Sequence, residues 1–175
     1  MCLSARYDKP LIDGIIPVDD REKVRVTAIN TGAPHAVVFV PNVETINVNE
    51  MGRRIRSLTH IFPLGTNVDF VQVEGECLRL RTYERGVECE TLACGTGAAA
   101  SVVASFLKGV IRPVERALVH MPGGTLEVRL KTEKETLVRV YLSGLLPYLF
   151  GGELDWSEGD SSRYSVNISH ATKSS

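Results

Sequence analysis

Hydrophobic and polar residues alternate along much of this chain, in short runs that predict β-strands. Alternation with a period of two places successive side chains on opposite faces of a sheet. Turn residues at 74–76 (EGE) and 122–124 (PGG) separate neighbouring runs and predict hairpin-like connections. The predicted strands are residues 24–29, 36–40, 68–73, 77–82, 117–121, 125–130 and 137–142.

Two stretches depart from this alternation and predict helices. Residues 98–107 (AAASVVASFL) are apolar on nearly every side, and Lys108-Gly109 marks their end. A helix without a polar face has no side for water, so other elements are expected to cover it. Residues 51–58 predict a short amphipathic helix, capped by Asn47 or Asn49, whose arginines form a solvated outer face.

Together these elements predict an α+β fold in which antiparallel strands wrap around a central buried helix, rather than a βαβ array. We expect residues 24–155 to form this domain. Residues 1–23, punctuated by Pro10, Gly14 and Pro17, lead into it at the domain boundary. Residues 156–175 are polar and rich in serine, which predicts a disordered tail.

The charge balance excludes some classes of partner. Twenty basic and twenty-one acidic residues give a net charge of −1, which argues against binding nucleic acid or an anionic membrane surface. No apolar run is long enough to span a bilayer, and the first residues, MCLSARYDKP, contain no signal-peptide core. A cytoplasmic location is therefore expected.

The four cysteines, at positions 2, 77, 89 and 94, form no CxxC pair and have no histidine at ligand spacing. This pattern predicts no metal site. A cytoplasmic protein keeps such thiols reduced, so each is expected to be either buried or reactive.

Cys94 stands out because it precedes Gly95-Thr96-Gly97 at the start of the predicted buried helix. The first amides of a helix carry partial positive charge, which favours a bound carboxylate and lowers the pKa of a nearby thiol. Cys94 is either a small buried hydrophobe or an acid/base thiol. A third interpretation, nucleotide binding through the G-x-G-x-x-A pattern, is weak because the nearest predicted strand ends near Thr82.

Four blocks of sequence then resemble the diaminopimelate epimerase family, in the family's order and at sensible spacing. Weaker likeness extends from the first residues to 140–144 (VYLSG) and 150–154 (FGGEL). The four blocks are 30–35 (NTGAPH), 62–71 (FPLGTNVDFV), 83–86 (YERG) and 90–98 (ETLACGTGA).

The resemblance implies an amino-acid epimerase, an isomerase that interconverts LL- and meso-diaminopimelate in lysine and cell-wall precursor biosynthesis. It implies no pyridoxal phosphate or other cofactor. Two cysteines would flank the α-carbon of the substrate, one removing its proton as a thiolate and the other returning a proton to the opposite face.

The matching motifs also imply roles for individual residues. Cys94 would be one of the two catalytic thiols, and Gly95 and Thr96 would offer amides to the α-carboxylate. Three more residues would contact the substrate: Asn67, Glu84 and Arg85. His35 and Glu84 would tune the protonation of the thiols, although a histidine in a turn between two strands is more commonly a surface or capping residue.

Two departures from the family limit this assignment. Ala33 stands where the family commonly has a substrate-contacting Asn, and the chain matches only the family's C-terminal part. The partner cysteine belongs to the N-terminal domain. Cys2 and Cys77 lack the surrounding glycines, and Cys89 is too close in sequence to Cys94 to serve the opposite face.

We therefore expect a Cys94-bearing half that is inactive alone and works with a complementing N-terminal half, in an enzyme that the family suggests is a homodimer. Two alternatives stay open: a related cofactor-independent amino-acid racemase or isomerase, and a non-catalytic carboxylate-binding fragment.

Overall fold

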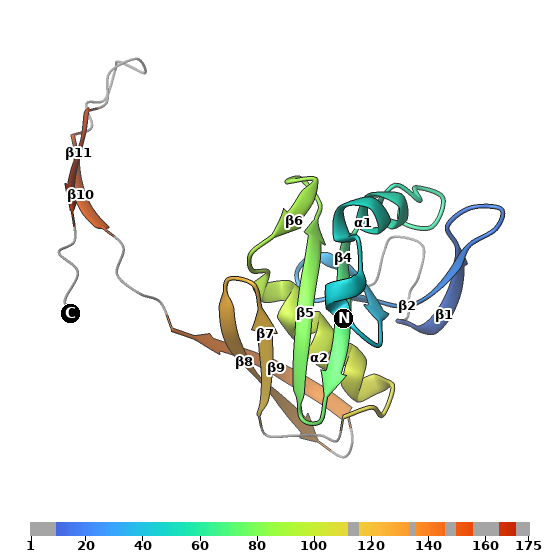
Figure 1. Ribbon diagram of the computed structural model, residues 1–175. Coiled ribbons are helices and arrows are strands. Elements are labelled where there is room, and N and C mark those ends of the chain that lie inside the picture. The colour runs from blue at the N-terminus through green and yellow to red at the C-terminus, as the bar shows by residue number, and fades with distance from the viewer. Residues whose placement is uncertain (1–9, 112–115, 134–135, 146–149, 156–164, 171–175) are drawn as a thin grey trace. The chain divides into compact units, whose positions relative to one another are not determined.

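The computed structural model describes residues 10–111, 116–133, 136–145, 150–155 and 165–170 (Figure 1). The chain divides into two compact units, residues 1–144 and 145–175, which are described separately. The strands of the larger unit are β1 (Leu11–Pro17), β2 (Lys23–Asn30), β3 (Pro34–Phe39), β4 (Asn67–Glu74), β5 (Cys77–Glu84), β6 (Cys89–Thr91), β7 (Ala117–Met121), β8 (Gly124–Glu133) and β9 (Thr136–Gly144). Its helices are the 3-10 turn η1 (Val43–Thr45), α1 (Val48–Arg56) and α2 (Gly95–Leu107).

These strands form one sheet in the order β1-β2-β3-β4-β5-β7-β8-β9, with β6 added beside β5. All seven predicted strands are present. The 74–76 turn closes the hairpin between β4 and β5, in which Glu74 faces Cys77. Residues 122–123 likewise join β7 to β8, because Met121 faces Gly124.

The prediction of purely antiparallel pairing is wrong at two places. β3 pairs with β4 in parallel, and β5 pairs with β7 in parallel. Parallel neighbours need a crossover of roughly a dozen residues or more, usually containing a helix. The connection from β3 to β4 contains α1, and the connection from β5 to β7 contains β6 and α2. The length of these two connections was the signal for parallel pairing.

Strand β5 shares one of its edges between two partners. Residues 77–79 pair with β7, whereas residues 82–84 pair with β6. A backbone hydrogen bond of 2.6 Å from Gly123 to the carbonyl of Leu92 joins the β7–β8 turn to the segment between β6 and α2. Both strands that flank α2 in the sequence are therefore anchored on the same strand.

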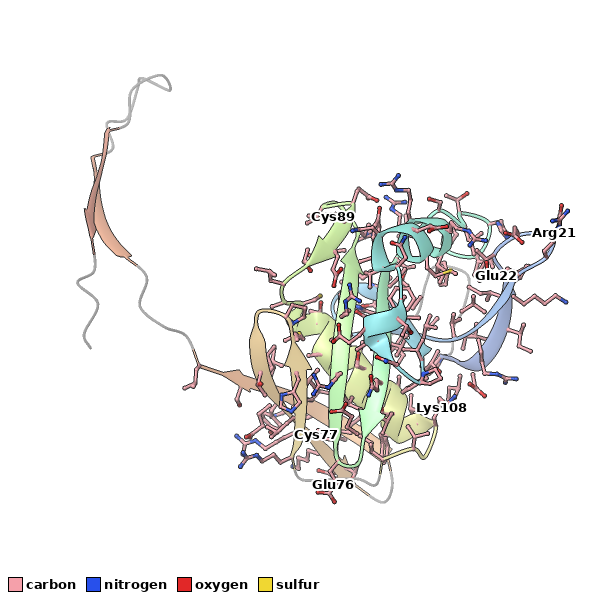
Figure 2. All side chains as sticks on the ribbon, viewed as in Figure 1. Arg21, Glu22, Glu76, Cys77, Cys89 and Lys108 are labelled. Carbon is pink, nitrogen blue, oxygen red and sulfur yellow. The ribbon has the colours of Figure 1, made fainter. Side chains whose placement is uncertain are left out.

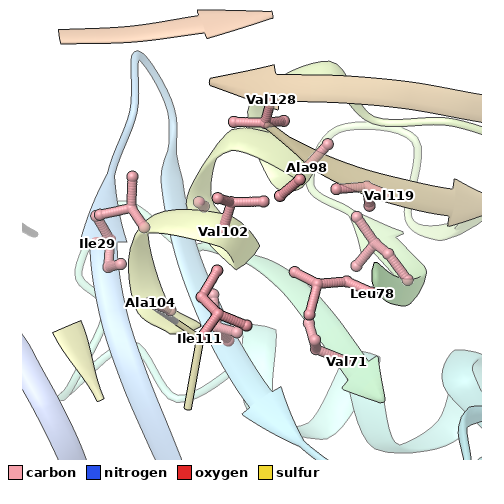
Figure 3. Close-up of a cluster of buried hydrophobic side chains, with 14 residues drawn as sticks. Ile29, Val71, Leu78, Ala98, Val102, Ala104, Ile111, Val119 and Val128 are labelled. Carbon is pink, nitrogen blue, oxygen red and sulfur yellow. The ribbon is translucent and has the colours of Figure 1, made fainter. Parts of the chain in front are cut away.

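Helix α2 is buried along its length, in keeping with its all-round apolar sequence. All residues from 97 to 105 are buried, and the helix packs against β2, β3, β4, β5, β8 and β9. Its two buried hydroxyls are satisfied within the helix, because Ser101 donates to the carbonyl of Gly97 and Ser105 to that of Ser101. Figure 3 shows Ala98, Val102 and Ala104 among apolar side chains of the sheet.

Helix α1 closes a second apolar cluster, in which Ile55, Phe62, Phe70 and Tyr83 are buried. Of the two candidate caps, Asn47 is the one used: its side chain accepts a hydrogen bond from the Glu50 amide. The predicted solvated arginine face is present only in part: Arg53 is exposed, whereas Arg54 and Arg56 are half-buried. Arg54 pairs with Asp19 and Glu22, and Arg56 pairs with Glu88.

Two strands of the larger unit were not predicted. Strand β1 (Leu11–Pro17) forms within the leading stretch, residues 1–23, and pairs with β2, so this strand contributes to the sheet. Strand β6 has only three residues and lies between the predicted strand 77–82 and the predicted helix 98–107. Neither helix of the described residues is long and apolar enough to cross a membrane.

The smaller unit contains an antiparallel pair, β10 (Phe150–Asp155) and β11 (Ser165–His170). Strand β11 lies within residues 156–175, where a disordered tail was expected. The expectation rested on serine content and overlooked the polar-apolar alternation of residues 165–170 (SVNISH). The remainder of that stretch, residues 156–164 and 171–175, falls outside the described residues.

Gly52 permits the close approach of α1 to β5, and its replacement tests that packing. A Cβ atom at Gly52 would lie 2.3 Å from the Cβ of Tyr83. Glycine to alanine in an open helix stabilises by about 1 kcal/mol. We expect the opposite sign for Gly52→Ala, a loss of about 1–3 kcal/mol in unfolding free energy, because the core is overpacked. Urea denaturation measures it, with the exposed neighbour Arg53→Ala as the control; a stabilised Gly52→Ala variant would contradict the packing.

Candidate active site

Cys94 is the residue that caps the N-terminus of α2. Its backbone is extended (φ −139°), and its carbonyl accepts the first hydrogen bond of the helix, 2.9 Å from the Ala98 amide. Only 7% of Cys94 is exposed, whereas Thr96, two residues later, is exposed. The buried thiol thus lies directly beside a helix turn that faces solvent, and the first-turn amides have no partner within the helix.

The strands beneath this helix end supply polar side chains from one face of the sheet. His35 of β3 pairs in register with Asn67 of β4, and Asp69 of β4 pairs in register with Thr82 of β5. Because side chains two residues apart share a face, these four residues lie together. All of them are buried, which is unusual for such polar groups and requires internal partners.

A chain of hydrogen bonds satisfies these groups and connects them to Cys94. Nδ1 of His35 lies 2.6 Å from Oδ2 of Asp69, and the two side chains are fully buried. Nε2 of His35 lies 3.0 Å from the Thr96 hydroxyl, which lies 3.6 Å from Sγ of Cys94. The reading of His35 as a surface or capping residue is therefore wrong: it lies inside the strand, 1% exposed.

The environment of Cys94 raises the pKa of its thiol. Burial is the largest cause, and the negative charges of Asp69 and Glu84 act in the same direction. The Thr96 hydroxyl and the Gly97 amide oppose them less strongly. The sequence-based expectation of a lowered pKa at the helix mouth is thus wrong in sign, because that argument counted the helix but neither the burial of the thiol nor the carboxylates near it.

The other predicted site residues surround this centre with different partners. Oδ1 of Asn67 accepts the Arg85 amide at 2.8 Å, and the Arg85 guanidinium donates to the Leu64 carbonyl at 2.6 Å. Glu84 accepts a hydrogen bond from Thr91 of β6 at 3.0 Å. Gly95 is half-buried and is the first residue of α2. Nδ2 of Asn67 lies 3.4 Å from Nε2 of His35, so Asn67 adjoins the His35 network, and Arg85 is linked to it through Asn67.

Asp69 and Thr82 are the residues that the sequence analysis missed. Thr82 donates to Oδ1 of Asp69 at 2.8 Å, while His35 contacts the other carboxylate oxygen. The signal was present in residues 67–71 (NVDFV), where a carboxylate interrupts a strand that is otherwise buried. A buried carboxylate needs a partner, and the histidine of the neighbouring strand provides it.

Cys77 and Cys89 lie near opposite ends of β5. Cys77 begins β5, whereas Cys89 pairs with Glu84 at the other end of that strand, and Figure 2 shows the two widely separated. Among the described residues, no group of three or more His, Cys, Asp or Glu side chains is arranged to hold a metal ion. The strand before α2, β6, runs antiparallel to β5, unlike the strand that opens a parallel dinucleotide-binding unit.

Comparison with solved structures shows which known fold this architecture resembles. A probable proline racemase from Agrobacterium radiobacter, crystallised with bound carbonate, aligns with a TM-score of 0.57 at 17% identity, over 77% of this chain and 49% of that one. The fold is thus an α+β racemase-like fold with a mixed sheet and two α-helices in the described residues.

Sequence comparison then identifies the family. Residues 27–144 match the diaminopimelate epimerase model, so the chain belongs to the diaminopimelate epimerase family. The diaminopimelate epimerase of Aquifex aeolicus is 45% identical over 136 residues, 77% of this chain and 48% of that protein. That of Methanocella arvoryzae is 42% identical over 74% of this chain and 44% of that protein. The chain spans about half the length of the curated relatives it matches.

The raised thiol pKa can be measured through alkylation, since only the thiolate reacts. In a variant that keeps Cys94 as its one cysteine, we expect the iodoacetamide rate to rise with pH to a midpoint above that of free cysteine. A variant that keeps only the exposed Cys89 controls for access of the reagent. A midpoint for Cys94 at or below that of N-acetylcysteine would contradict the charge environment described above.

Proposed function

We propose that this chain supplies one of the two acid/base thiols of a diaminopimelate epimerase, which interconverts LL- and meso-diaminopimelate without a cofactor. The observation that carries the proposal is the position of Cys94, buried at the N-terminus of α2 and next to the amides of Gly95 and Thr96. Family membership supplies the reaction, and this geometry supplies a thiol and an anion-binding helix end in one place.

The chemistry requires removing a weakly acidic proton from the α-carbon. Amides of Gly95 and Thr96 that bind the α-carboxylate would stabilise the negative charge that develops there. Burial raises the pKa of the Cys94 thiol, so in this proposal Cys94 starts as the thiol that gives a proton. In the reverse direction the same group, as a thiolate, removes the proton.

The remaining roles follow from the contacts. Asn67 and Arg85, joined by a backbone hydrogen bond, form the side of the site that meets the substrate, with Glu84 beside them. His35 and Glu84 set the protonation of Cys94, the first through Thr96 and the second through its charge. In this proposal helix α2 is the central element of the larger unit, residues 1–144, which carries the site. The enzyme acts in the cytoplasm.

The partner in this proposal is a polypeptide equivalent to the other half of the curated relatives, in an enzyme that forms a homodimer. Two thiols on opposite faces of the α-carbon are required, and the described residues place only Cys94 at the helix end. A related racemase acting on another amino acid is the second candidate, favoured by Ala33 where the family commonly has Asn.

Exchange of the α-proton in deuterated water tests the reaction. We expect no measurable exchange of LL-diaminopimelate with these 175 residues alone. Exchange and epimerisation should appear when the remaining part of the Aquifex aeolicus relative is supplied. Cys94→Ala should reduce the complemented activity by a factor on the order of 10² to 10⁴, the usual contribution of an acid/base group.

Cys89→Ala is the matched control, because it removes an exposed thiol that lies on β6 and not at the end of α2. Robust turnover by the chain alone, or full activity of Cys94→Ala, would refute the two-thiol proposal. Activity on another amino acid in a substrate panel would favour the related racemase. If the complemented protein shows neither proton exchange nor calorimetric binding of diaminopimelate, the result would favour a non-catalytic fragment.

A further inference from the structure

The contacts between Asp69 and Cys94 run through two intermediate groups in an unbroken line. Oδ2 of Asp69 lies 2.6 Å from Nδ1 of His35, and Nε2 of His35 lies 3.0 Å from the hydroxyl of Thr96. That hydroxyl lies 3.6 Å from Sγ of Cys94, within reach of a hydrogen bond to sulfur. The line joins β4, β3 and the first turn of α2.

The partners of His35 determine which of its nitrogens carries the proton. A carboxylate only accepts hydrogen bonds, so Asp69 fixes the proton on Nδ1. The orientation of the Asn67 side chain supports the same tautomer of His35. Its Oδ1 accepts a hydrogen bond from the backbone amide of Arg85, so its Nδ2 faces Nε2 of His35 at 3.4 Å. Nε2 is therefore an acceptor, and the Thr96 hydroxyl donates to it.

The hydroxyl of Thr96 can then accept from the thiol while it donates to His35. Each donor in the line is thereby directed the same way, from Cys94 through Thr96 and His35 to Asp69. Asp69 itself is held from its other side by Thr82, which donates to Oδ1 at 2.8 Å. Gly97 keeps this region compact, since a Cβ there would lie 2.6 Å from Oδ1 of Asp69 and 3.2 Å from Sγ of Cys94.

We propose that Asp69 is a positioning residue for the reaction and that Thr96 carries a proton between Cys94 and His35. The S–H bond of Cys94 breaks as an O–H bond forms on Thr96, and the original Thr96 proton moves to Nε2 of His35. The products are a thiolate and an imidazolium, with the Asp69 carboxylate next to the new positive charge. The reverse transfer restores the thiol. This deepens the proposed function and rests on the acid/base role of Cys94.

The charged and titratable groups around Cys94 suit this transfer. Asp69 from β4 and Glu84 from β5 both disfavour an isolated thiolate, and burial does the same. His35 from β3 is the group within the network that can take up the proton. Transfer to His35 keeps the net charge of the buried cluster constant, which avoids the cost of adding a charge to it.

The tautomer of His35 is the first test, measured by ¹⁵N NMR on the full chain. We expect wild-type His35 to be protonated at Nδ1 with an unprotonated Nε2. In Asp69→Asn the Nε2-protonated form should become populated, whereas Thr82→Val, which removes the other partner of Asp69, should keep the wild-type tautomer. An Nε2-protonated His35 in the wild type, or no change in Asp69→Asn, would overturn the proposal.

The hydroxyl of Thr96 gives a second test that does not depend on folding of the Asp69 variant. Thr96 is exposed, so Thr96→Val removes the hydroxyl with little loss of core packing. We expect the alkylation rate of Cys94 near neutral pH to fall by about tenfold, equivalent to one pKa unit. Thr96→Ser keeps a hydroxyl and should retain most of the wild-type rate. Equal rates for Thr96→Val and Thr96→Ser would overturn the relay.

These readouts separate the relay from the proposed function. If the tautomer and alkylation results hold but the complemented protein shows no proton exchange, then the epimerase proposal fails and the relay stands. In an active complemented enzyme, Asp69→Asn should lower kcat by a factor on the order of 10² while KM is unchanged, since Asp69 orients an acid/base group and meets no substrate. A change confined to KM would contradict the positioning role.

Discussion

The structure depends on how a fully buried carboxylate is accommodated beneath the N-terminal end of a helix that is buried from residue 97 to residue 105. Asp69 has no access to water, and it is stable there because His35 and Thr82 each contact one of its oxygens. Removing either partner would leave part of a buried charge unsatisfied. The same contacts fix the positions of β3, β4 and β5 relative to the first turn of α2, so the core and the site share one set of interactions.

Much of the fold follows from local pattern. The period-two runs locate seven strands, and the all-round apolar run locates α2, because each pattern reflects burial on one face or on all sides. Pairing direction was not visible locally, since it depends on connection length and on which strands become neighbours. The short strands β1 and β6 were missed because they owe their existence to pairing with β2 and β5 rather than to their own sequence.

The site divides in a similar way. Motifs pointed to Cys94, His35 and Asn67, and the structure brings these three into one network. Asp69 was overlooked although it interrupts an otherwise buried strand, because its partner became clear only from the fold, which places it beside His35. The sign of the thiol pKa shift was equally invisible, because it depends first on the burial of Cys94 and then on carboxylates from two other strands, none of which shows in the local sequence.

The shared edge of β5 also bears on how the molecule opens. The chain runs from β6 through α2 to β7, and both strands hydrogen-bond to β5. The backbone hydrogen bond from Gly123 to Leu92 joins the two ends of this segment. We expect such a segment to open as a single cooperative unit, with its amides exchanging with solvent together rather than one turn at a time. The rigidity of the Cys94 turn is thereby a property of β5, a strand that contributes no thiol of its own to the reaction.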